Sequence, residues 1–180
     1  MNKTSHRTSL RTTLHVIASV AKQSIFIILF CINILGVFSQ KTPLPALPNF
    51  LFYTANNAIF THNTLPANKP TMIMRFDPDC DHCQKQATMI KENAALFKDC
   101  QFLWVSFSPN PVQVLGFQKK YFDNVPVTAY FVIDKDFKFD TYFTDMGDSP
   151  PQIFLYNTER KFLKYYKQET PAAELATYLK

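Results

Sequence analysis

The sequence predicts an α/β domain with a central mixed sheet, formed by residues 50–180. Short apolar runs typical of strands alternate along this stretch with segments whose apolar residues recur with the period of a helix. Such alternation is typical of a sheet covered by helices. The chain has 180 residues, of which 47% are hydrophobic, so it can bury a sizeable core. This composition favours one globular domain of moderate size with an N-terminal extension.

The first part of this domain should contain a β-hairpin and a strand–helix unit. Residues 50–60 are predicted to form two short strands around a turn at Asn56-Asn57. A buried strand is expected over residues 71–76, and the helix after it should end near residue 98. The apolar residues that share one face of this helix are Ala87, Ile90, Ala94 and Phe97.

The middle of the domain should contribute a buried strand at residues 100–107, a helix at 112–122 and a strand at 125–133. The residues of the helix that we expect to face inward are Val112, Leu115, Tyr121 and Phe122. Residues 134–148 are rich in aromatic and acidic side chains and are expected to form a short helix. The aromatic residues expected to pack on the domain there are Phe137, Phe139, Tyr142 and Phe143.

Two strands and a helix should close the chain. The strands are expected at residues 152–156 and 161–166, joined by a turn. The helix should begin near Thr170, with Pro171 at its first position, where a missing N–H has no cost. Its expected inward residues are Ala172, Leu175, Ala176 and Leu179.

Residues 1–40 have the pattern of a secretory signal peptide. The first 22 residues are basic and contain no acid, and residues 24–38 are almost continuously apolar. The alternative is an uncleaved anchor in the inner membrane formed by residues 24–40, because 18 uncharged residues separate two lysines there. Residues 41–49 should form an extended, proline-rich linker. Either interpretation predicts a periplasmic or secreted domain, in a compartment where disulfides persist.

The net charge of +5 arises in this leader rather than in the domain. Four of the 19 Lys and Arg residues lie in the first 22 positions, which leaves 15 of them against 14 Asp and Glu. A near-neutral domain without a basic patch argues against nucleic acid as a partner. The three glycines of the chain do not form a glycine-rich phosphate loop.

The predicted chemistry lies at Cys80 and Cys83, where the strand at residues 71–76 passes into the following helix. The free N–H groups and the partial positive charge of a helix start stabilise a thiolate placed there. Thiols in such Cys-x-x-Cys pairs are nucleophilic. Cys80 would therefore attack disulfides, and Cys83, one turn into the helix, would resolve the mixed disulfide.

Two other roles for this cysteine pair remain open. A closed zinc site needs four ligands, and only His82, His62 and Cys100 could join the pair in the mature chain. A structural disulfide across a gap of two residues closes almost no loop and so stabilises little. A redox-active dithiol is therefore the favoured interpretation.

The strand, the motif Phe-x-Pro-x-Cys-x-x-Cys and the amphipathic helix after it resemble the thioredoxin-like superfamily. Within this superfamily, the motif and its surroundings most resemble exported thiol–disulfide oxidoreductases of the thiol–disulfide interchange and cytochrome-maturation type. The resemblance covers roughly residues 50–180 and implies a three-layer α/β/α fold with an N-terminal β-hairpin. It implies that Cys80 is the nucleophile, that Cys83 resolves and that His82 tunes the thiolate. No cofactor is implied beyond the redox-active Cys80–Cys83 disulfide.

The resemblance also implies a substrate groove formed by Pro150, Pro151 and Asp79. Pro151 matches the superfamily's cis-proline, although Pro150 could be the cis residue instead. The residue before that proline usually offers its N–H and C=O to the substrate, but Pro150 has no N–H.

Two more departures argue against a general-purpose cytoplasmic-type reductase. Met74 stands where thioredoxin has a buried acid, and Asp79 stands where an aromatic residue usually precedes the first cysteine.

The predicted function is therefore thiol–disulfide exchange with exported protein substrates. The expected partners are protein thiols and disulfides, and a membrane or periplasmic redox partner that restores the dithiol. We expect a monomer. The alternatives are a non-catalytic thioredoxin-like binding module and a copper- or zinc-handling protein that uses the same cysteines. Cys100 is expected to be a small buried core residue rather than part of the site.

Overall fold

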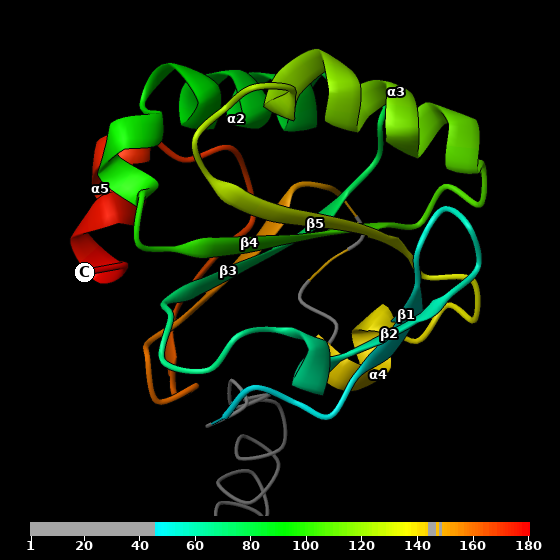
Figure 1. The fold of residues 1–180 in the computed structure, drawn as a ribbon, viewed down its shortest axis with the longest axis horizontal. Helices are drawn as coiled ribbons and strands as arrows, with labels where there is room; N and C mark the ends of the chain where they lie inside the picture. Colours follow the sequence, from blue (N-terminus) through cyan, green and yellow to red (C-terminus); the bar gives the residue numbers. More distant parts are fainter. Residues whose placement is uncertain (1–45, 144–146, 148) are drawn as a thin grey trace, which may run out of the picture. The chain divides into compact units, whose positions relative to one another are not determined.

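A seven-stranded mixed sheet forms the centre of the computed structural model, which describes residues 46–143, 147 and 149–180 (Figure 1). The strands are β1 (Leu51–Tyr53), β2 (Ile59–Thr61), β3 (Thr71–Phe76), β4 (Gln101–Ser106), β5 (Thr128–Ile133), β6 (Gln152–Tyr156) and β7 (Phe162–Tyr166). The helices are α2 (Asp81–Glu92), α3 (Pro111–Phe122), α4 (Phe139–Phe143) and α5 (Ala172–Tyr178), with short 3₁₀ helices η1 (His62–Thr64) and η2 (Ala94–Phe97). The predicted leader, residues 1–40, and the first part of the linker lie outside the described residues.

The middle of the sheet is parallel, because helices connect its strands. α2 joins β3 to β4, and α3 joins β4 to β5, so these three strands run in one direction. β6 and β7 extend the sheet antiparallel beside β3, and the β1–β2 hairpin attaches to the edge of β5. All residues of β4 are buried, as expected for a strand covered on both faces. The predicted α/β fold with a mixed sheet and an N-terminal hairpin is confirmed.

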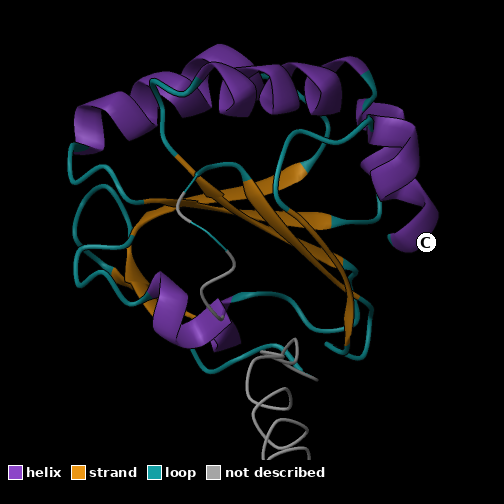
Figure 2. Ribbon diagram, turned by 180° about the vertical axis from the view of Figure 1, so that it is seen from behind, coloured by secondary structure: helices purple, strands orange, loops and turns teal. Residues whose placement is uncertain are grey.

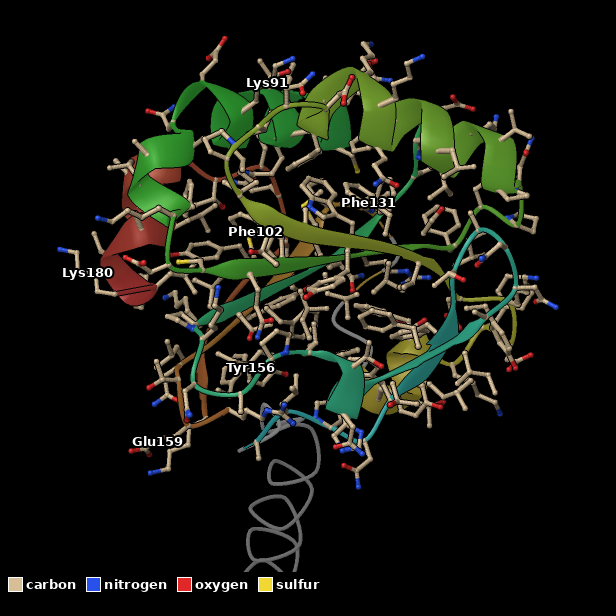
Figure 3. All side chains as sticks on the ribbon, viewed as in Figure 1. Lys91, Phe102, Phe131, Tyr156, Glu159 and Lys180 are labelled. Carbon is tan, nitrogen blue, oxygen red and sulfur yellow. The ribbon has the colours of Figure 1, made fainter. Side chains whose placement is uncertain are left out.

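Two hydrophobic cores lie on opposite faces of the sheet. Because side chains alternate along a strand, Met72 and Met74 of β3 pack with α2, α3 and α5, whereas Ile73 packs with the hairpin and α4. Figures 1 and 2 show α2 and α3 along one side of the sheet and α4 on the other. Figure 3 labels Phe102 and Phe131 in the helix-side core and Tyr156 in the opposite core. The architecture thus has three layers.

The helix after the cysteines has the predicted inward face but ends earlier than predicted. Its expected apolar residues Ala87, Ile90, Ala94 and Phe97 are all buried. However, α2 ends at Glu92, because Asn93 turns its side-chain amide back to the Met89 carbonyl at 2.9 Å. Asn side chains compete for backbone groups in this way and so favour helix ends. The last two inward residues belong to the separate helix η2.

The predicted inward face of α3 is wrong at two positions. Val112 is 75% exposed and Leu115 is 51% exposed, whereas Val114, Phe117 and Tyr121 are buried. The side chain of Asn110 accepts a hydrogen bond from the Val112 N–H at 3.0 Å and so fixes where the helix starts. Phe117 then lies on the inner face among the aromatic rings of the sheet. The aromatic cluster, rather than the aliphatic residues, determines which face is buried.

The region after β5 also corrects one prediction. Phe139 and Phe143 of α4 are buried as expected, but Phe137 is 71% exposed. The Asp134 carboxylate accepts hydrogen bonds from the Lys138 and Phe139 N–H groups at 2.9 Å each, which fixes the start of α4 two residues after a left-handed turn at Phe137. In the last helix, all four predicted inward residues are buried, but Pro171 is the N-cap rather than the first helical residue.

Candidate active site

Cys80 lies at the N-cap of α2, directly after the turn that follows β3. Its own N–H donates to the Asp77 carbonyl at 3.1 Å, and its sulfur accepts a hydrogen bond from the Cys83 N–H at 3.3 Å. The first N–H groups of a helix lack partners within the helix, so a thiolate at this position receives both a hydrogen bond and the helix dipole. Cys80 is partly exposed, so a substrate sulfur can approach it.

Cys83 is the buried member of the pair. It belongs to the core between α2 and the sheet and has no exposed surface. Burial raises the pKa of the Cys83 thiol strongly, and its hydrogen bond with Cys80 raises this pKa further. The two cysteines are not joined by a disulfide in this structure. The geometry thus separates an accessible leading thiol from a protected second thiol.

Pro150 and Pro151 form the loop directly before β6, and this loop lies beside Cys80. The Pro150–Pro151 peptide bond is cis, which agrees with the prediction for Pro151. The Cys80 thiol donates to the Pro150 carbonyl at a sulfur–oxygen distance of 3.7 Å. Since Pro150 has no N–H, this carbonyl is the only backbone hydrogen-bonding group that the residue offers.

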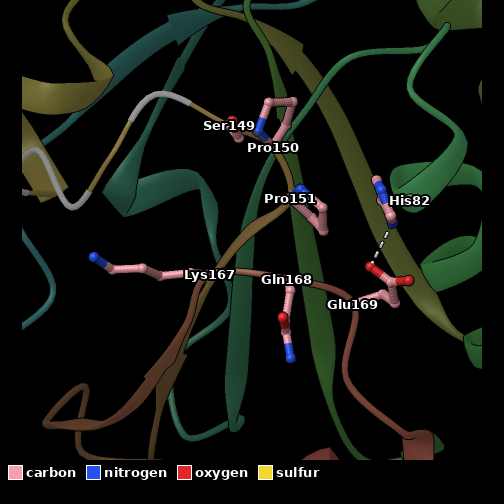
Figure 4. Close-up of a pocket in the computed structure, with 7 residues that line it drawn as sticks. All are labelled: His82, Ser149, Pro150, Pro151, Lys167, Gln168 and Glu169. Carbon is pink, nitrogen blue, oxygen red and sulfur yellow. Dashed lines mark ion pairs between the residues drawn. The ribbon is translucent and has the colours of Figure 1, made fainter.

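Beside the prolines is a pocket of about 350 Å³. Its lining comes from the start of α2, the proline loop and the segment between β7 and α5, namely His82, Ser149, Pro150, Pro151, Lys167, Gln168 and Glu169 (Figure 4). His82 Nδ1 lies 2.7 Å from Glu169 Oε2. The hydrogen bond with His82 is the main cause that lowers the pKa of the Glu169 carboxyl. The sequence predicted His82 but not its partner.

Asp79 is exposed and is tied to α3 rather than aimed at the pocket. Gln113 Nε2 donates to Asp79 Oδ2 at 2.9 Å. A second connection links the same loop to α3, because the Tyr121 hydroxyl donates to Gln84 Oε1 and Gln84 Nε2 donates to the Pro78 carbonyl, each at 3.0 Å. These bonds fix the loop that carries Cys80. Asp79, which was predicted to bind substrate, thus makes a contact that holds the loop before α2 against α3.

Comparison with solved structures decides the fold. A secreted disulfide oxidoreductase from Mycobacterium tuberculosis, described as homologous to E. coli DsbE, is 19% identical, with a TM-score of 0.56 over 73% of this chain and 94% of that one. The mycobacterial protein DsbF is 20% identical, with a TM-score of 0.60 over 76% of this chain and 96% of that one. StoA from Bacillus subtilis is 16% identical, with a TM-score of 0.56 over 76% of this chain and all of that one (100%).

The chain has a thioredoxin-like fold. No protein-family model and no curated protein sequence matches it. In this thioredoxin-like fold, β3 leads to the cysteine motif, and the cis-proline loop leads into β6, the antiparallel neighbour of β3. The fold therefore brings Cys80 and Pro150 together although they are 70 positions apart in the chain.

Met74, at the position of thioredoxin's buried acid, is fully buried in the helix-side core. It supplies no proton acceptor beneath the dithiol. The charge of the Asp77 carboxylate raises the pKa of the Cys83 thiol, whereas the backbone hydrogen bond at Asp77 lowers this pKa by more. Asp77 accepts a hydrogen bond from the Asp79 N–H at 2.8 Å. At the position where thioredoxin has a buried acid, this chain thus has the apolar side chain of Met74.

Cys100 is a buried core residue, as predicted. Its thiol donates to the Leu179 carbonyl at 3.1 Å, and burial raises its pKa to about 11. Cys100 precedes the first residue of β4, whereas Cys80 follows the last residue of β3, and these strands are parallel with Thr71 opposite Gln101. The two cysteines therefore lie at opposite ends of the sheet. This geometry gives no support for a resolving role of Cys100.

Among residues 46–143, 147 and 149–180, no group of three or more His, Cys, Asp and Glu side chains is placed to hold a metal ion. Over the same residues, none of the helices has the length and apolar character needed to cross a membrane.

Proposed function

We propose that the protein is a thiol–disulfide oxidoreductase that exchanges disulfides with exported protein substrates through Cys80 and Cys83. The observation that carries this proposal is the asymmetry of the pair: an accessible sulfur at a helix N-cap next to a fully buried one. Two structures with the same fold are named as a disulfide oxidoreductase and as a protein observed in mixed oxidised and reduced forms, which supports a redox role.

The exchange is a sequence of two displacements. The Cys80 thiolate attacks one sulfur of a substrate disulfide, so that a mixed disulfide forms and the other substrate sulfur leaves as a thiolate. Cys83, after losing its proton, attacks Cys80 Sγ, which forms the Cys80–Cys83 disulfide and releases the second substrate sulfur. Two electrons pass from the protein to the substrate. A dithiol partner returns them, and the reverse sequence oxidises a substrate.

The remaining residues of the site have supporting roles in this proposal. His82 tunes the Cys80 thiolate, and the loop of Pro150 and Pro151 forms one wall of the groove that receives the substrate chain. Asp79 stabilises the loop through its bond to Gln113. We propose that the protein is a monomer and needs no cofactor beyond the Cys80–Cys83 disulfide. We further propose that a membrane or periplasmic redox partner restores the dithiol.

We also propose that the domain acts in the periplasm or outside the cell. The support is the basic and then apolar pattern of residues 1–40, with residues 24–40 as the possible anchor if the leader is not removed. A structure with the same fold comes from a secreted protein. Residues 41–49 would then link the leader to a thioredoxin-like domain at residues 50–180.

A trapping experiment tests the proposal. Reduced Cys83→Ser protein is mixed with insulin, whose disulfides serve as the substrate. The variant should accumulate a mixed disulfide at Cys80, because no second thiol resolves it, whereas Cys80→Ser should form none. Cys100→Ser is the matched control and should reduce insulin at the wild-type rate. Absence of a Cys80 adduct would overturn the enzyme proposal. A double variant, Cys80→Ser/Cys83→Ser, that still restores growth of a deletion strain would indicate a binding module.

A further inference from the structure

Glu169 is a carboxylate that the proposed exchange reaction does not use, although it contacts a residue of the Cys-x-x-Cys motif. It lies on the segment between β7 and α5, and its Oε2 is 2.7 Å from His82 Nδ1 (Figure 4). The Glu169 side chain is 28% exposed, whereas the His82 side chain is 59% exposed. The carboxylate is therefore the less exposed member of the pair, and its contact can restrain the imidazole.

The position of Glu169 is fixed by a second bond to the same helix. The next residue, Thr170, donates its N–H to Gln86 Oε1 at 2.7 Å, and both residues are buried. Gln86 lies four residues after His82 on α2, so one helix face contacts the segment at two successive turns. The segment that carries Glu169 is thus held against α2 independently of the His82 contact.

The charged groups around the pair are few and mixed in sign. Asp81 and Lys85 of α2 line a neighbouring pocket together with Glu169, and Lys167 lines the pocket that contains His82. Lys85 and His82 both lower the pKa of the Glu169 carboxyl, with the His82 hydrogen bond as the largest cause. Glu169 is therefore ionised at neutral pH and accepts a hydrogen bond from His82 Nδ1–H.

We propose that Glu169 is a positioning residue for His82: it fixes the Nδ1–H tautomer and the direction of the imidazole, and through them the stability of the Cys80 thiolate. This inference rests on the proposed function, because its redox consequence needs a reversible Cys80–Cys83 couple. A hydrogen bond at one ring nitrogen determines which form the other nitrogen takes. With Nδ1–H donated to Glu169, Nε2 carries the lone pair of the neutral ring and is the nitrogen that takes up a proton when the imidazole becomes charged.

Without Glu169 the imidazole of His82 is no longer held, and it stabilises the Cys80 thiolate less. Because the thiolate belongs to the reduced state, the dithiol then becomes easier to oxidise. We expect Glu169→Ala to shift the equilibrium constant with glutathione about threefold toward the Cys80–Cys83 disulfide, which is a potential lower by about 14 mV at 29.6 mV per tenfold change. Glu169→Gln retains an oxygen acceptor and should lie between wild type and Glu169→Ala.

The experiment measures these equilibrium constants by thiol alkylation and mass mapping of the full chain. The control is Glu159→Gln, which removes another ion-paired glutamate, the partner of Lys161, and should leave the constant unchanged. In a His82→Ala background, Glu169→Ala should cause no further shift, because its effect passes through the imidazole. An equal shift in both backgrounds, a shift toward the dithiol, or no shift in the wild type overturns the proposal.

A second readout does not depend on redox activity. Nitrogen-15 NMR of the imidazole in reduced wild type should show His82 as the Nδ1–H tautomer when neutral, and Glu169→Ala should change it toward Nε2–H. An Nε2–H tautomer in the wild type contradicts the positioning role. If instead no reversible Cys80–Cys83 couple exists while the tautomer depends on Glu169, the proposed function fails and the positioning role stands.

Discussion

Alkylation of the reduced protein should distinguish its thiols by orders of magnitude in rate. The reagent reacts with the thiolate, so the rate depends on the thiolate fraction and on access to the sulfur. Cys80 is partly exposed and receives a helix N–H, whereas Cys83 and Cys100 are buried. We therefore expect Cys80 to be modified first.

The size of the difference follows from the structure. The pKa of Cys100 is about 11, so at pH 7 only about one molecule in 10⁴ carries that thiolate. An ordinary thiol with a pKa of about 8.5 is about 3% thiolate at the same pH, which is roughly 300-fold more. Burial also requires a local opening before reagent reaches the sulfur. Cys83, whose pKa is raised strongly by burial, should be protected in the same way.

The assay is a time course with iodoacetamide at pH 7, followed by digestion and mass mapping of each cysteine peptide. Cys80 should be at least 100-fold faster than Cys83 and Cys100 in the native protein. In 6 M guanidinium chloride the rates should converge, because burial and the helix N-terminus are lost. Equal native rates for Cys80 and Cys83 would show that the asymmetry on which the mechanism depends is wrong.

Three further predictions concern the fold and its pH dependence. Trp104→Ala removes a fully buried ring and should lower the free energy of unfolding by about 3–5 kcal/mol in urea titrations, and a loss below about 1 kcal/mol would contradict the packing described. Asp134→Ala removes the acceptor at the start of α4 and should cost about 1 kcal/mol, whereas Asp134→Asn should cost less; equal losses would argue against capping. The pKa of Glu169 is lowered by His82, so its stabilisation exists above the unfolded pKa of about 4.3 and is lost as pH falls through the folded pKa. The difference in urea midpoint between wild type and Glu169→Gln should therefore be present at pH 5.5 and shrink as the pH falls below about 4, and a constant difference would refute this linkage.

The strands and the dithiol could be predicted because local signals specify them. The apolar run at residues 71–76 and the cysteines after it are adjacent in the chain, so their strand, turn and helix follow from short-range pattern. The cis-proline loop was predicted only through the resemblance to the thioredoxin-like superfamily, because Pro151 stands before a strand at the place of that superfamily's cis-proline. The face of α3 was not, because Val112 is as apolar as Val114, and only the aromatic rings on the sheet decide which of them is covered.

The partner of His82 had no signal in the sequence. Glu169 lies in a connection between β7 and α5, and nothing in the neighbouring sequence distinguishes it from the other acidic residues of the chain. Its role depends on how the last segment of the chain crosses the start of α2, which is fixed by the buried bond between Gln86 and Thr170. Such contacts between distant segments arise from tertiary packing and not from local pattern.

The most direct test of the central claim is a redox titration of Cys80 and Cys83 in glutathione buffers, with alkylation and mass mapping of both cysteines. The account predicts one reversible two-electron couple, with a midpoint in the range of about −120 to −270 mV covered by thiol–disulfide exchange proteins. A midpoint nearer −120 mV would indicate an oxidase, and one more negative than about −230 mV a reductase. Absence of a reversible couple would contradict the account. So would a midpoint potential below about −300 mV, which is typical of structural disulfides.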